Sequence, residues 1–322
     1  MLISYSFLVI QNLKTRQENN IFGNGCSIIK REQLFGGDIN QAFKLTLSDK
    51  TTVFMKSNSI ENAAFFPEEE KGLKALKECA AIGVPEVISH GIDDESKTSF
   101  LLLEYLESAP KIKNYAEVLG HELAALHKSE TKRFLEIDSN SQDFSKIISN
   151  SPLSQNKFGF SSDNFIGYTK QINTPASKWA DFFRESRLMP QFKMAERYFD
   201  NSIKTKIEKL LSKIENLIPE PDFPSLIHGD LWSGNVITGP DGKGWLIDPA
   251  CYVGSFEAEL AMTSLFGGFS SAFYNAYDEI IKIPSDFSER IDLYNLYHLL
   301  NHLNMFGRSY LSEVIHIINE YA

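Results

Sequence analysis

Cysteine is scarce in this sequence. The three cysteines, Cys26, Cys79 and Cys251, are far apart. A disulfide framework or a zinc site needs cysteines at short, paired spacings. Neither is therefore expected, and the composition fits a reducing, cytoplasmic setting.

Long apolar runs are also missing. No stretch approaches the ~20 apolar residues that a membrane-spanning helix requires. The segment from Met1 to Ile10 is apolar, but it lacks the basic start and the small-residue cleavage site of a signal peptide. We therefore expect no membrane partner, and we predict that this segment packs against the smaller of two lobes, with a disordered extension as the alternative.

Basic residues are outnumbered by acidic ones. The chain has 32 Lys and Arg against 42 Asp and Glu, a formal net charge of −10. Because binding to a phosphate backbone needs a basic face, nucleic acid is not expected as a partner. With 322 residues, 43% hydrophobic and 23% charged, the chain is long enough for two lobes with cores of their own.

The most informative stretch runs from Leu226 to Asp248 and reads LIHGDLWSGNVITGPDGKGWLID. A single Asp before Ser, Gly and Asn is most often a turn or capping residue. Here, four residues separate Asp230 from Asn235, which is the spacing of a kinase catalytic loop. In that loop the Asp lies near the hydroxyl nucleophile and the Asn binds Mg²⁺. The sequence therefore predicts Asp230 as the catalytic residue.

A β-hairpin is predicted directly after this loop. Val236-Ile237 and Trp245–Ile247 flank a Gly-Pro-Asp-Gly-Lys-Gly turn, a typical hairpin pattern. Such a hairpin would fold Asp248 back beside Asn235. Since Mg²⁺ prefers oxygen ligands, we predict Asn235 and Asp248 as its protein ligands.

An antiparallel sheet is predicted upstream, with strands at 27–35, 42–47 and 51–56. Gly36 and Gly37 lie in the first turn, where their backbone N–H groups can approach phosphate oxygens. Lys56 ends the third strand, the position from which kinases hold the α- and β-phosphates. A solvated lysine at a strand end is the alternative interpretation.

A helix is predicted over 62–80, with three consecutive glutamates, Glu68 to Glu70, in its first turn. Carboxylates there suit the helix dipole, which explains all three without a functional role. A kinase pairs one such Glu with the strand lysine. Because Leu73 lies one turn beyond Glu69, Glu69 is close to the apolar face, and we predict its pairing with Lys56.

Two more strands, at 85–88 and 99–104, are predicted to complete the sheet. The second leads into a connector at the position of a kinase hinge, where backbone groups hold adenine. We assign this role to Leu103, Glu104, Tyr105 and Leu106. The predicted fold is α+β, a two-lobed protein-kinase-like fold with a small antiparallel β lobe, 1–106, and a larger, mainly helical lobe, 107–322.

Aromatic and amide residues are concentrated downstream, at 158–187 and 292–310. Amides bind hydroxyl groups in pairs and an indole covers a sugar face, so this composition suits a polyol. Helix-packing aromatics are the alternative for any one residue. The substrate residues predicted here and in the catalytic loop are Asn164, Trp179, Trp232 and His302.

Other polar residues received structural interpretations. His121 and His127, on a helix predicted over 113–129, are read as structural or exposed, since no further ligand-type residues follow at metal spacing. Glu257 and Glu259 either anchor the segment behind the catalytic loop or serve as ordinary first-turn carboxylates.

Three runs in the sequence resemble the fructosamine kinase (ketosamine-3-kinase) family. They are HGDLWSGN at 228–235, IDPA at 247–250 and EAELAMTSLFGGF at 257–269. The Trp-Ser-Gly insert is the specific part, because aminoglycoside phosphotransferases and choline kinases share His-Gly-Asp and the Asn but usually lack it. Two departures are Asp38, in the glycine turn, and Lys71, which interrupts the acidic run.

The resemblance implies ATP- and Mg²⁺-dependent phosphorylation of the sugar 3-hydroxyl of ketosamines, either free or on glycated protein lysines. The resulting 3-phosphates are unstable, so the family is associated with deglycation. A monomer or weak dimer is expected. An aminoglycoside- or choline-type phosphotransferase and a non-catalytic, kinase-shaped binding protein remain as alternatives.

Overall fold

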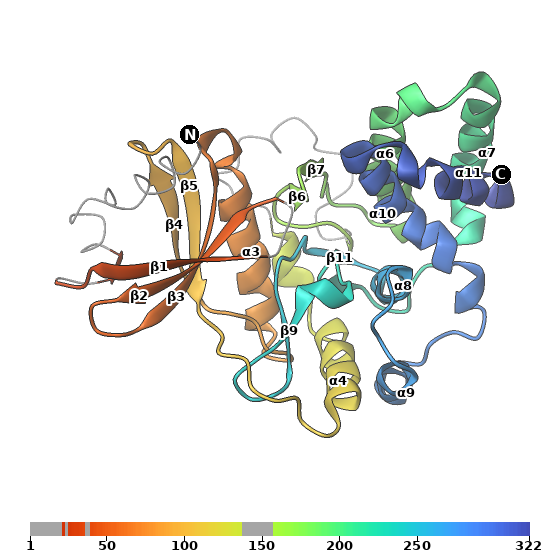
Figure 1. Ribbon diagram of the computed structural model, residues 1–322. Helices are drawn as coiled ribbons and strands as arrows, with labels where there is room; N and C mark the ends of the chain where they lie inside the picture. The colour runs from red at the N-terminus through yellow and green to blue at the C-terminus, as the bar shows by residue number, and fades with distance from the viewer. Residues whose placement is uncertain (1–20, 23–24, 36–38, 137–156) are drawn as a thin grey trace.

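A computed structural model describes residues 21–22, 25–35, 39–136 and 157–322. The chain forms a lobe built on an antiparallel sheet and a larger lobe made mainly of helices (Figure 1). The predicted α+β, two-lobed fold is therefore confirmed. The predictions for Met1 to Ile10 and for the Gly36-Gly37 turn lie outside the described residues.

The sheet of the smaller lobe has five antiparallel strands in the order β1-β2-β3-β5-β4. All five predicted strands form, although β3 and β4 extend further than predicted. Their bounds are Ile28–Leu34 (β1), Gln41–Leu47 (β2), Thr52–Ser59 (β3), Val87–Asp93 (β4) and Thr98–Glu104 (β5).

Alternation along the strands divides the sheet into two faces. On one face Val53 and Met55 join a small cluster with Phe100 and Leu102, whereas the intervening residues Leu101 and Leu103 of β5 belong to the main core. Lys56 pairs in register with Leu101. The same alternation places Lys56 on the face toward the main core.

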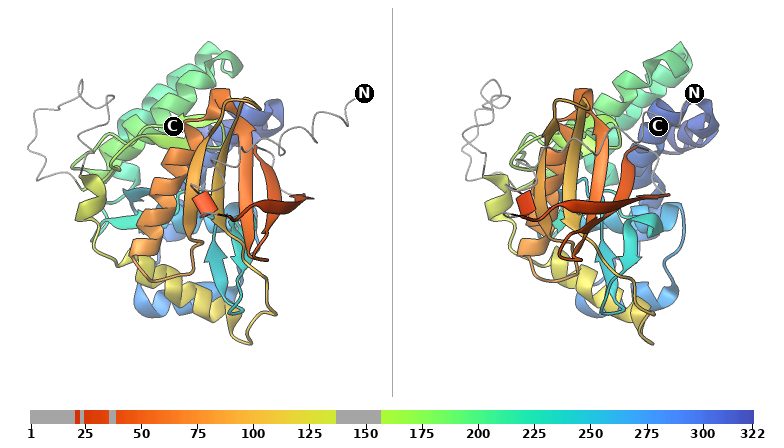
Figure 2. Two further views of the ribbon diagram at one scale, coloured as in Figure 1. Left: turned by 90° about the vertical axis from the view of Figure 1, so that its left-hand side faces the viewer. Right: turned by 60° about the vertical axis from the view of Figure 1, so that its left-hand side comes forward.

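Helix α3, Phe65–Glu78, covers that face of the sheet (Figure 2). A short 3-10 turn, Ile60–Asn62, precedes it, so the helix begins three residues later than predicted. Pro67 lies in its first turn, where a missing N–H costs nothing. Its buried residues include Phe66, Leu73 and Leu76, and they leave Glu69 on the same side of the helix.

The larger lobe contains α4 and the helices from α5 onward. The α-helices are α4 (Tyr115–His127), α5 (Trp179–Phe182), α6 (Met189–Met194), α7 (Asn201–Leu217), α8 (Phe256–Leu265), α9 (Ser271–Ile280), α10 (Ile291–Phe306) and α11 (Leu311–Tyr321). A π-helical segment, Phe183–Leu188, joins α5 to α6. Short 3-10 turns lie at Lys132–Leu135, Glu196–Tyr198, Ser233–Asn235, Phe287–Glu289 and Arg308–Tyr310. Across the described ranges, no helix has the length and apolar content needed to cross a membrane.

Three pairs of very short antiparallel strands complete the larger lobe. They are β6 with β7 (Asn164–Ile166 and Thr169–Gln171), β8 with β11 (Ser225–Ile227 and Tyr252–Gly254), and β9 with β10 (Val236–Thr238 and Gly244–Leu246). The β9–β10 pair is the predicted hairpin. Both it and the β8–β11 pair flank the loop that carries Asp230.

Candidate active site

The loop between β8 and β9 is closed by hydrogen bonds at its base. The backbone N–H of Ala250 donates to the carbonyl oxygen of His228 at 2.9 Å. The buried imidazole of His228 contacts the carbonyl oxygen of Ile247 through Nε2 at 2.8 Å. Burial lowers the pKa of His228, so the ring is neutral and this nitrogen is the donor. The loop and the end of the β9–β10 hairpin are therefore fixed to each other.

Gly229 sets the direction of the chain just before Asp230. Its φ is +81°, a left-handed conformation that favours glycine. A methyl group at this position would lie 2.1 Å from the carbonyl oxygen of Ala250. No side chain fits there, so the tight approach of the loop to residue 250 requires glycine.

Asp230 lies partly exposed at the tip of this loop. The side-chain amide of Asn235 donates to the carbonyl oxygen of Asp230 at 2.8 Å and to its carboxylate at 3.3 Å. Burial, and after it the negative charge of Asp248, raise the pKa of Asp230 to about 7. A carboxylate with such a pKa can accept a proton near neutral pH.

Asp248 lies beside Asn235, as the hairpin predicted. The backbone N–H of Ile247 donates to the carbonyl oxygen of Asn235 at 3.1 Å. Asp248 itself has a φ of +58°, which turns the chain sharply after β10. Its side chain is 44% exposed, so solvent can reach the carboxylate.

Lys56 joins this group from the sheet of the other lobe. Its ammonium forms an ion pair with Asp248 and a second one with Glu69 of α3 at 2.5 Å. Burial lowers the pKa of Lys56, but the charges of Asp248 and Glu69 outweigh burial and raise the pKa overall. Burial, and after it the charge of Asp248, raise the pKa of Glu69 against the opposing effect of Lys56. The predicted Lys56–Glu69 pair is thus present.

The oxygen atoms of Asn235 and Asp248 suit a divalent cation. The amide nitrogen of Asn235 donates its hydrogen bond to Asp230. The side-chain oxygen of Asn235 therefore remains available as a ligand. In the part of the chain that the structure describes, no three His, Cys, Asp or Glu side chains gather as a metal site. A Mg²⁺ ion held here would therefore complete its shell with phosphate and water oxygens, as it commonly does.

A fully buried carboxylate on α8 holds the loop from behind. Glu259 accepts the backbone N–H groups of His228 and Gly229, each at 2.8 Å. It also contacts His127 of α4 at 3.1 Å, and His127 in turn lies 2.7 Å from the hydroxyl of Tyr277. Burial raises the pKa of Glu259, but its hydrogen bonds and the nearby histidines outweigh burial and lower the pKa.

Glu259 therefore anchors the catalytic loop, which was one of its two predicted roles. Its neighbour Glu257 instead pairs with Arg290 at 2.7 Å. His127 is structural, as predicted, and its part in this anchor has no signal in the sequence.

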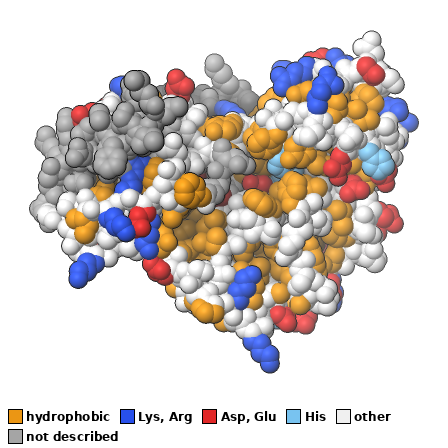
Figure 3. All heavy atoms as spheres, in the orientation of Figure 1, with side chains coloured by type: hydrophobic (Ala, Val, Ile, Leu, Met, Phe, Trp, Pro, Cys, Tyr) orange, Lys and Arg blue, Asp and Glu red, His pale blue; other side chains and the backbone are white. Residues whose placement is uncertain are grey.

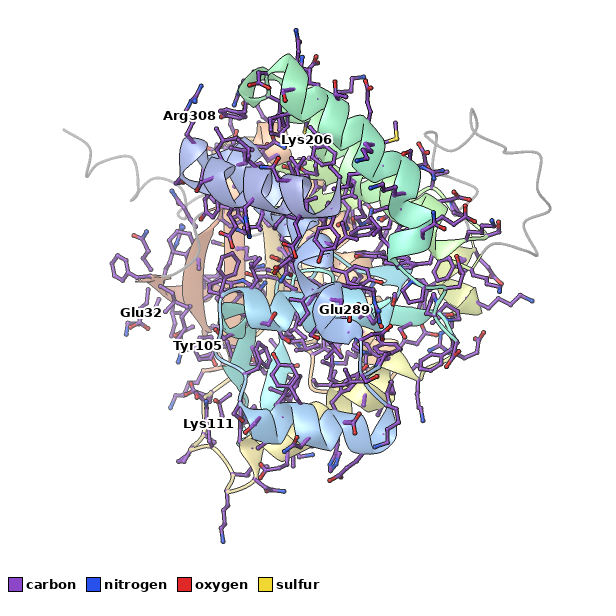
Figure 4. All side chains as sticks on the ribbon, turned by 90° about the vertical axis from the view of Figure 1, so that its right-hand side faces the viewer. Glu32, Tyr105, Lys111, Lys206, Glu289 and Arg308 are labelled. Carbon is purple, nitrogen blue, oxygen red and sulfur yellow. The ribbon has the colours of Figure 1, made fainter. Side chains whose placement is uncertain are left out.

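The predicted hinge lies at the end of β5. Leu103 is buried, and the backbone N–H of Glu104 donates to the carbonyl oxygen of Glu86 at 2.9 Å. The ring of Tyr105 lies beneath the ammonium of Lys44 at 3.9 Å. Figure 4 shows Tyr105 where the chain leaves the sheet, above Lys111 on the connector to α4. Leu106 follows on this connector, so the four residues lie where the chain passes from the sheet to α4.

Trp232 lies in the catalytic loop, and His302 lies on α10 of the larger lobe. Trp232 is 40% exposed, and its indole covers Gly234, where a methyl group would lie 2.2 Å from the ring. His302 is half-buried, and its Nδ1 contacts the carbonyl oxygen of His298 at 2.9 Å. Phe266 links the two, because its ring lies near both.

The structure corrects the substrate roles predicted for Asn164 and Trp179. Asn164 is 3% exposed, and its amide donates to the carbonyl oxygen of Cys251 at 2.8 Å. Trp179 is fully buried, and its indole N–H donates to the hydroxyl of Tyr294 at 3.3 Å. Neither side chain can contact an acceptor here, because packing and internal hydrogen bonds occupy both.

The chain matches a known protein family along most of its length. The fructosamine kinase family model matches residues 10–322. A protein named "Protein-ribulosamine 3-kinase, chloroplastic" from Arabidopsis thaliana is 36% identical over 304 residues, 93% of this chain and 84% of the relative. One named "Probable ketoamine kinase" from Vibrio cholerae is 34% identical over 311 residues, 95% of this chain and 96% of the relative.

Two solved structures are similar in fold to this chain. The crystal structure of a protein assigned as a fructosamine-3-kinase, from Haemophilus somnus 129PT, is 28% identical, with a TM-score of 0.78 and 98% coverage of each chain. A type I macrolide 2'-phosphotransferase is 13% identical, with a TM-score of 0.54 and coverage of 92% of this chain and 93% of its own. That second likeness shows the fold alone.

Proposed function

The chain belongs to the fructosamine kinase family, and we propose that it is an ATP-dependent kinase acting on the 3-hydroxyl of ketosamine sugars. The observation that supports this most strongly is the convergence of Lys56, Asp230, Asn235 and Asp248 on one space between the lobes. A kinase-shaped binding protein without activity usually lacks one of these four groups, and this chain retains them all.

ATP would bind between the sheet and the larger lobe. The backbone of residues 103–106 would hold the adenine, and Lys56 would contact the α- and β-phosphates. The Lys56–Glu69 pair supports this role, because it fixes the ammonium on the cleft side of the sheet. We retain Gly36 and Gly37 as the predicted cover of the phosphates.

Asn235 and Asp248 would hold Mg²⁺ through their side-chain oxygens. When bound, the ion would neutralise the charge that develops on the transferred phosphoryl group. Lys56, now paired with Asp248, would turn to the phosphates once the charge of Asp248 is neutralised.

Asp230 would orient the sugar 3-hydroxyl and take its proton as the oxygen attacks the γ-phosphorus and ADP leaves. Its raised pKa of about 7 matches this task, since a base works best with a pKa near the operating pH. Trp232, exposed beside it, would cover one face of the sugar.

The remaining features of the proposal come from the family. We infer that the acceptors are small ketosamines or glycated protein lysines, and that loss of the unstable 3-phosphate leads to deglycation. We also propose a cytoplasmic setting, a monomer or weak dimer, and a lobe boundary between residues 106 and 107.

The deciding experiment measures transfer of labelled phosphate from Mg·ATP. Ribulosyl-lysine and fructosyl-lysine would be offered beside choline and an aminoglycoside, with Asp230→Ala as the matched inactive control. Transfer to a ketosamine but not to the other two acceptors supports the proposal. Transfer only to choline or the aminoglycoside would overturn the substrate class, and no transfer to any acceptor would overturn the kinase assignment.

A further inference from the structure

Five aromatic rings form a continuous strip that leads away from the catalytic loop. Trp232 lies 6.3 Å from Phe266, and Phe266 lies 5.2 Å from His302, measured between ring centroids. His302 stacks on Phe306 at 5.5 Å and on Tyr310 at 5.1 Å. We call these five residues the aromatic strip. It connects the tip of the catalytic loop with the segment before α11.

The strip is open to solvent. Trp232, Phe266 and Phe306 are 40%, 44% and 50% exposed. Hydrophobic side chains gather between and beside the two lobes in Figure 3. Exposed aromatic residues in mutual contact next to a reactive group mark a binding surface more often than scattered ones do.

Local packing fixes the strip at the mouth of the site. Gly268 approaches the side chain of Ser233 so closely that a methyl group would lie 2.4 Å from its Cβ. This contact holds the end of α8, and with it Phe266, against the catalytic loop. At the other end, Met305 lies against Gly167, which also neighbours Ile39 beside the glycine turn. The last turn of α10 therefore borders the space between the lobes.

The rings of the strip carry no formal charge at neutral pH. Because burial lowers the pKa of His302, its ring is neutral, and Nδ1–H donates to the carbonyl oxygen of His298. Neutral aromatic faces favour alkyl and aromatic groups, and they also attract an alkylammonium. Arg308, at the far end of the strip (Figure 4), is exposed.

We propose that the aromatic strip binds the peptide segment that carries the sugar-modified lysine, with apolar residues beside that lysine resting on Phe266 and Phe306. This inference depends on the proposed function. A sugar placed at Asp230 can cover Trp232, but the strip continues through four more rings. The group attached to the sugar is therefore the part of an acceptor that can reach them. A free amino acid would bring its carboxylate there, and the electron-rich faces of the rings match an anion poorly.

The test uses three acceptors with the same ribulosyl-lysine. One is a peptide with Phe and Leu beside the modified lysine, one is the same peptide with Gly and Ser there, and one is the Nα-acetylated single residue. We expect kcat/KM to be about tenfold higher for the apolar peptide than for the other two, since a few buried aromatic contacts dominate such interfaces. Phe266→Ser and Phe306→Ser should each remove most of this preference, because they should lower kcat/KM for the apolar peptide several-fold more than kcat/KM for the single residue.

Ile88→Ser and Ile92→Ser are the matched controls. These isoleucines are 39% and 44% exposed on β4, away from the strip, and their variants should keep the preference. Equal rates for all three acceptors in the unmodified protein would overturn the inference while leaving the kinase proposal intact. An equal loss on all acceptors in the Phe variants would also overturn it. Absence of transfer to every acceptor would instead reject the proposed function.

Discussion

The carboxylate of Glu259 accepts the backbone N–H of Gly229 at 2.8 Å. Its second oxygen accepts the N–H of His228. Both donors belong to the residues immediately before Asp230, and Gly229 has the left-handed backbone that aims Asp230 at the cleft. A single buried side chain on α8 therefore fixes the direction of the catalytic loop.

Glu259→Gln is expected to lower both stability and turnover. The amide keeps one acceptor oxygen and leaves one buried backbone N–H without a partner, at a cost of about 1–3 kcal/mol. Since the loop would lose its fixed direction, kcat should fall about tenfold or more, while KM for ATP stays near normal. Chemical denaturation and steady-state kinetics measure the two effects.

Glu257→Gln is the matched control for this variant. Glu257 lies on the same helix as Glu259, and its buried ion partner is Arg290, just before α10. Weakening this ion pair should lower stability without a comparable loss of kcat per folded molecule. Equal kcat values for the two variants would contradict the positioning role of Glu259.

Asp230→Ala is expected to lower kcat by at least ~10²-fold, because that is the usual loss when a general base is removed. The affinity for Mg·ATP should stay close to normal, since Asp230 contacts the acceptor rather than the nucleotide. Isothermal titration with a non-hydrolysable ATP analogue separates the two effects. Turnover near that of the unmodified protein would reject Asp230 as the base.

The pH dependence of kcat/KM should show an acidic limb near pH 7. Asp230 must be ionised to accept a proton, and its pKa is raised to about 7 in the free protein. Activity should therefore rise with pH up to this value and level off above it. The charge of Asp248 contributes to the raised pKa of Asp230, and bound Mg²⁺ would neutralise it. The acidic limb of the kcat profile should therefore lie at lower pH than the acidic limb of the kcat/KM profile. Identical limbs in both profiles would show that the charge of Asp248 does not act on Asp230.

Asp230→Asn is expected to stabilise the nucleotide-free protein at alkaline pH. The folded carboxyl has a pKa of about 7 against a usual 3.8, so its ionisation costs more in the folded chain than in the unfolded one. Stability is therefore lost as pH rises from about 4 through 7. The variant lacks this loss, so its advantage should grow between pH 5 and pH 7, by at most ~1.4 kcal/mol per pH unit, and then stay level up to pH 8. Urea denaturation at pH 5 and pH 8, in EDTA, measures the free energy of unfolding of both proteins. A difference between them that is the same at the two pH values would contradict the raised pKa of Asp230.

Asp248→Ala is expected to abolish the Mg²⁺-dependent part of ATP binding. Asn235 alone would leave the ion with one protein oxygen, and Lys56 would lose one of its two carboxylate partners. Titration with ATP in Mg²⁺ and in EDTA gives the comparison. Mg·ATP affinity equal to that of the unmodified protein would count against Asp248 as a ligand.

Much of the site followed from spacing along the sequence. The hairpin after the catalytic loop brought Asn235 and Asp248 together because two short strands joined by a turn can fold in only a few ways. The pairing of Lys56 with Glu69 was predicted because Lys56 ends the third strand and helix periodicity places Glu69 near the apolar face. Both predictions depend on residues close in sequence, and both were correct because the hairpin, the strand and the helix are regular.

The substrate residues could not be predicted in the same way. Trp179 and Asn164 have the composition of a polyol site, but packing with distant residues such as Tyr294 and Cys251 decides their burial. The three-residue strands β6, β7 and β11 are too short to give a periodic signal. Sequence distance likewise hid the partnership of His127 with Glu259.

The contact between Glu68 and Ser162 helps to hold the two lobes together. The hydroxyl of Ser162 donates to Glu68 at 2.5 Å, and Lys71 also donates to this hydroxyl at 3.1 Å. These bonds fasten the start of α3 to the larger lobe, next to the Lys56–Glu69 pair. Glu68 therefore ties α3 to the larger lobe, while the neighbouring Glu69 ties the same helix to the sheet through Lys56.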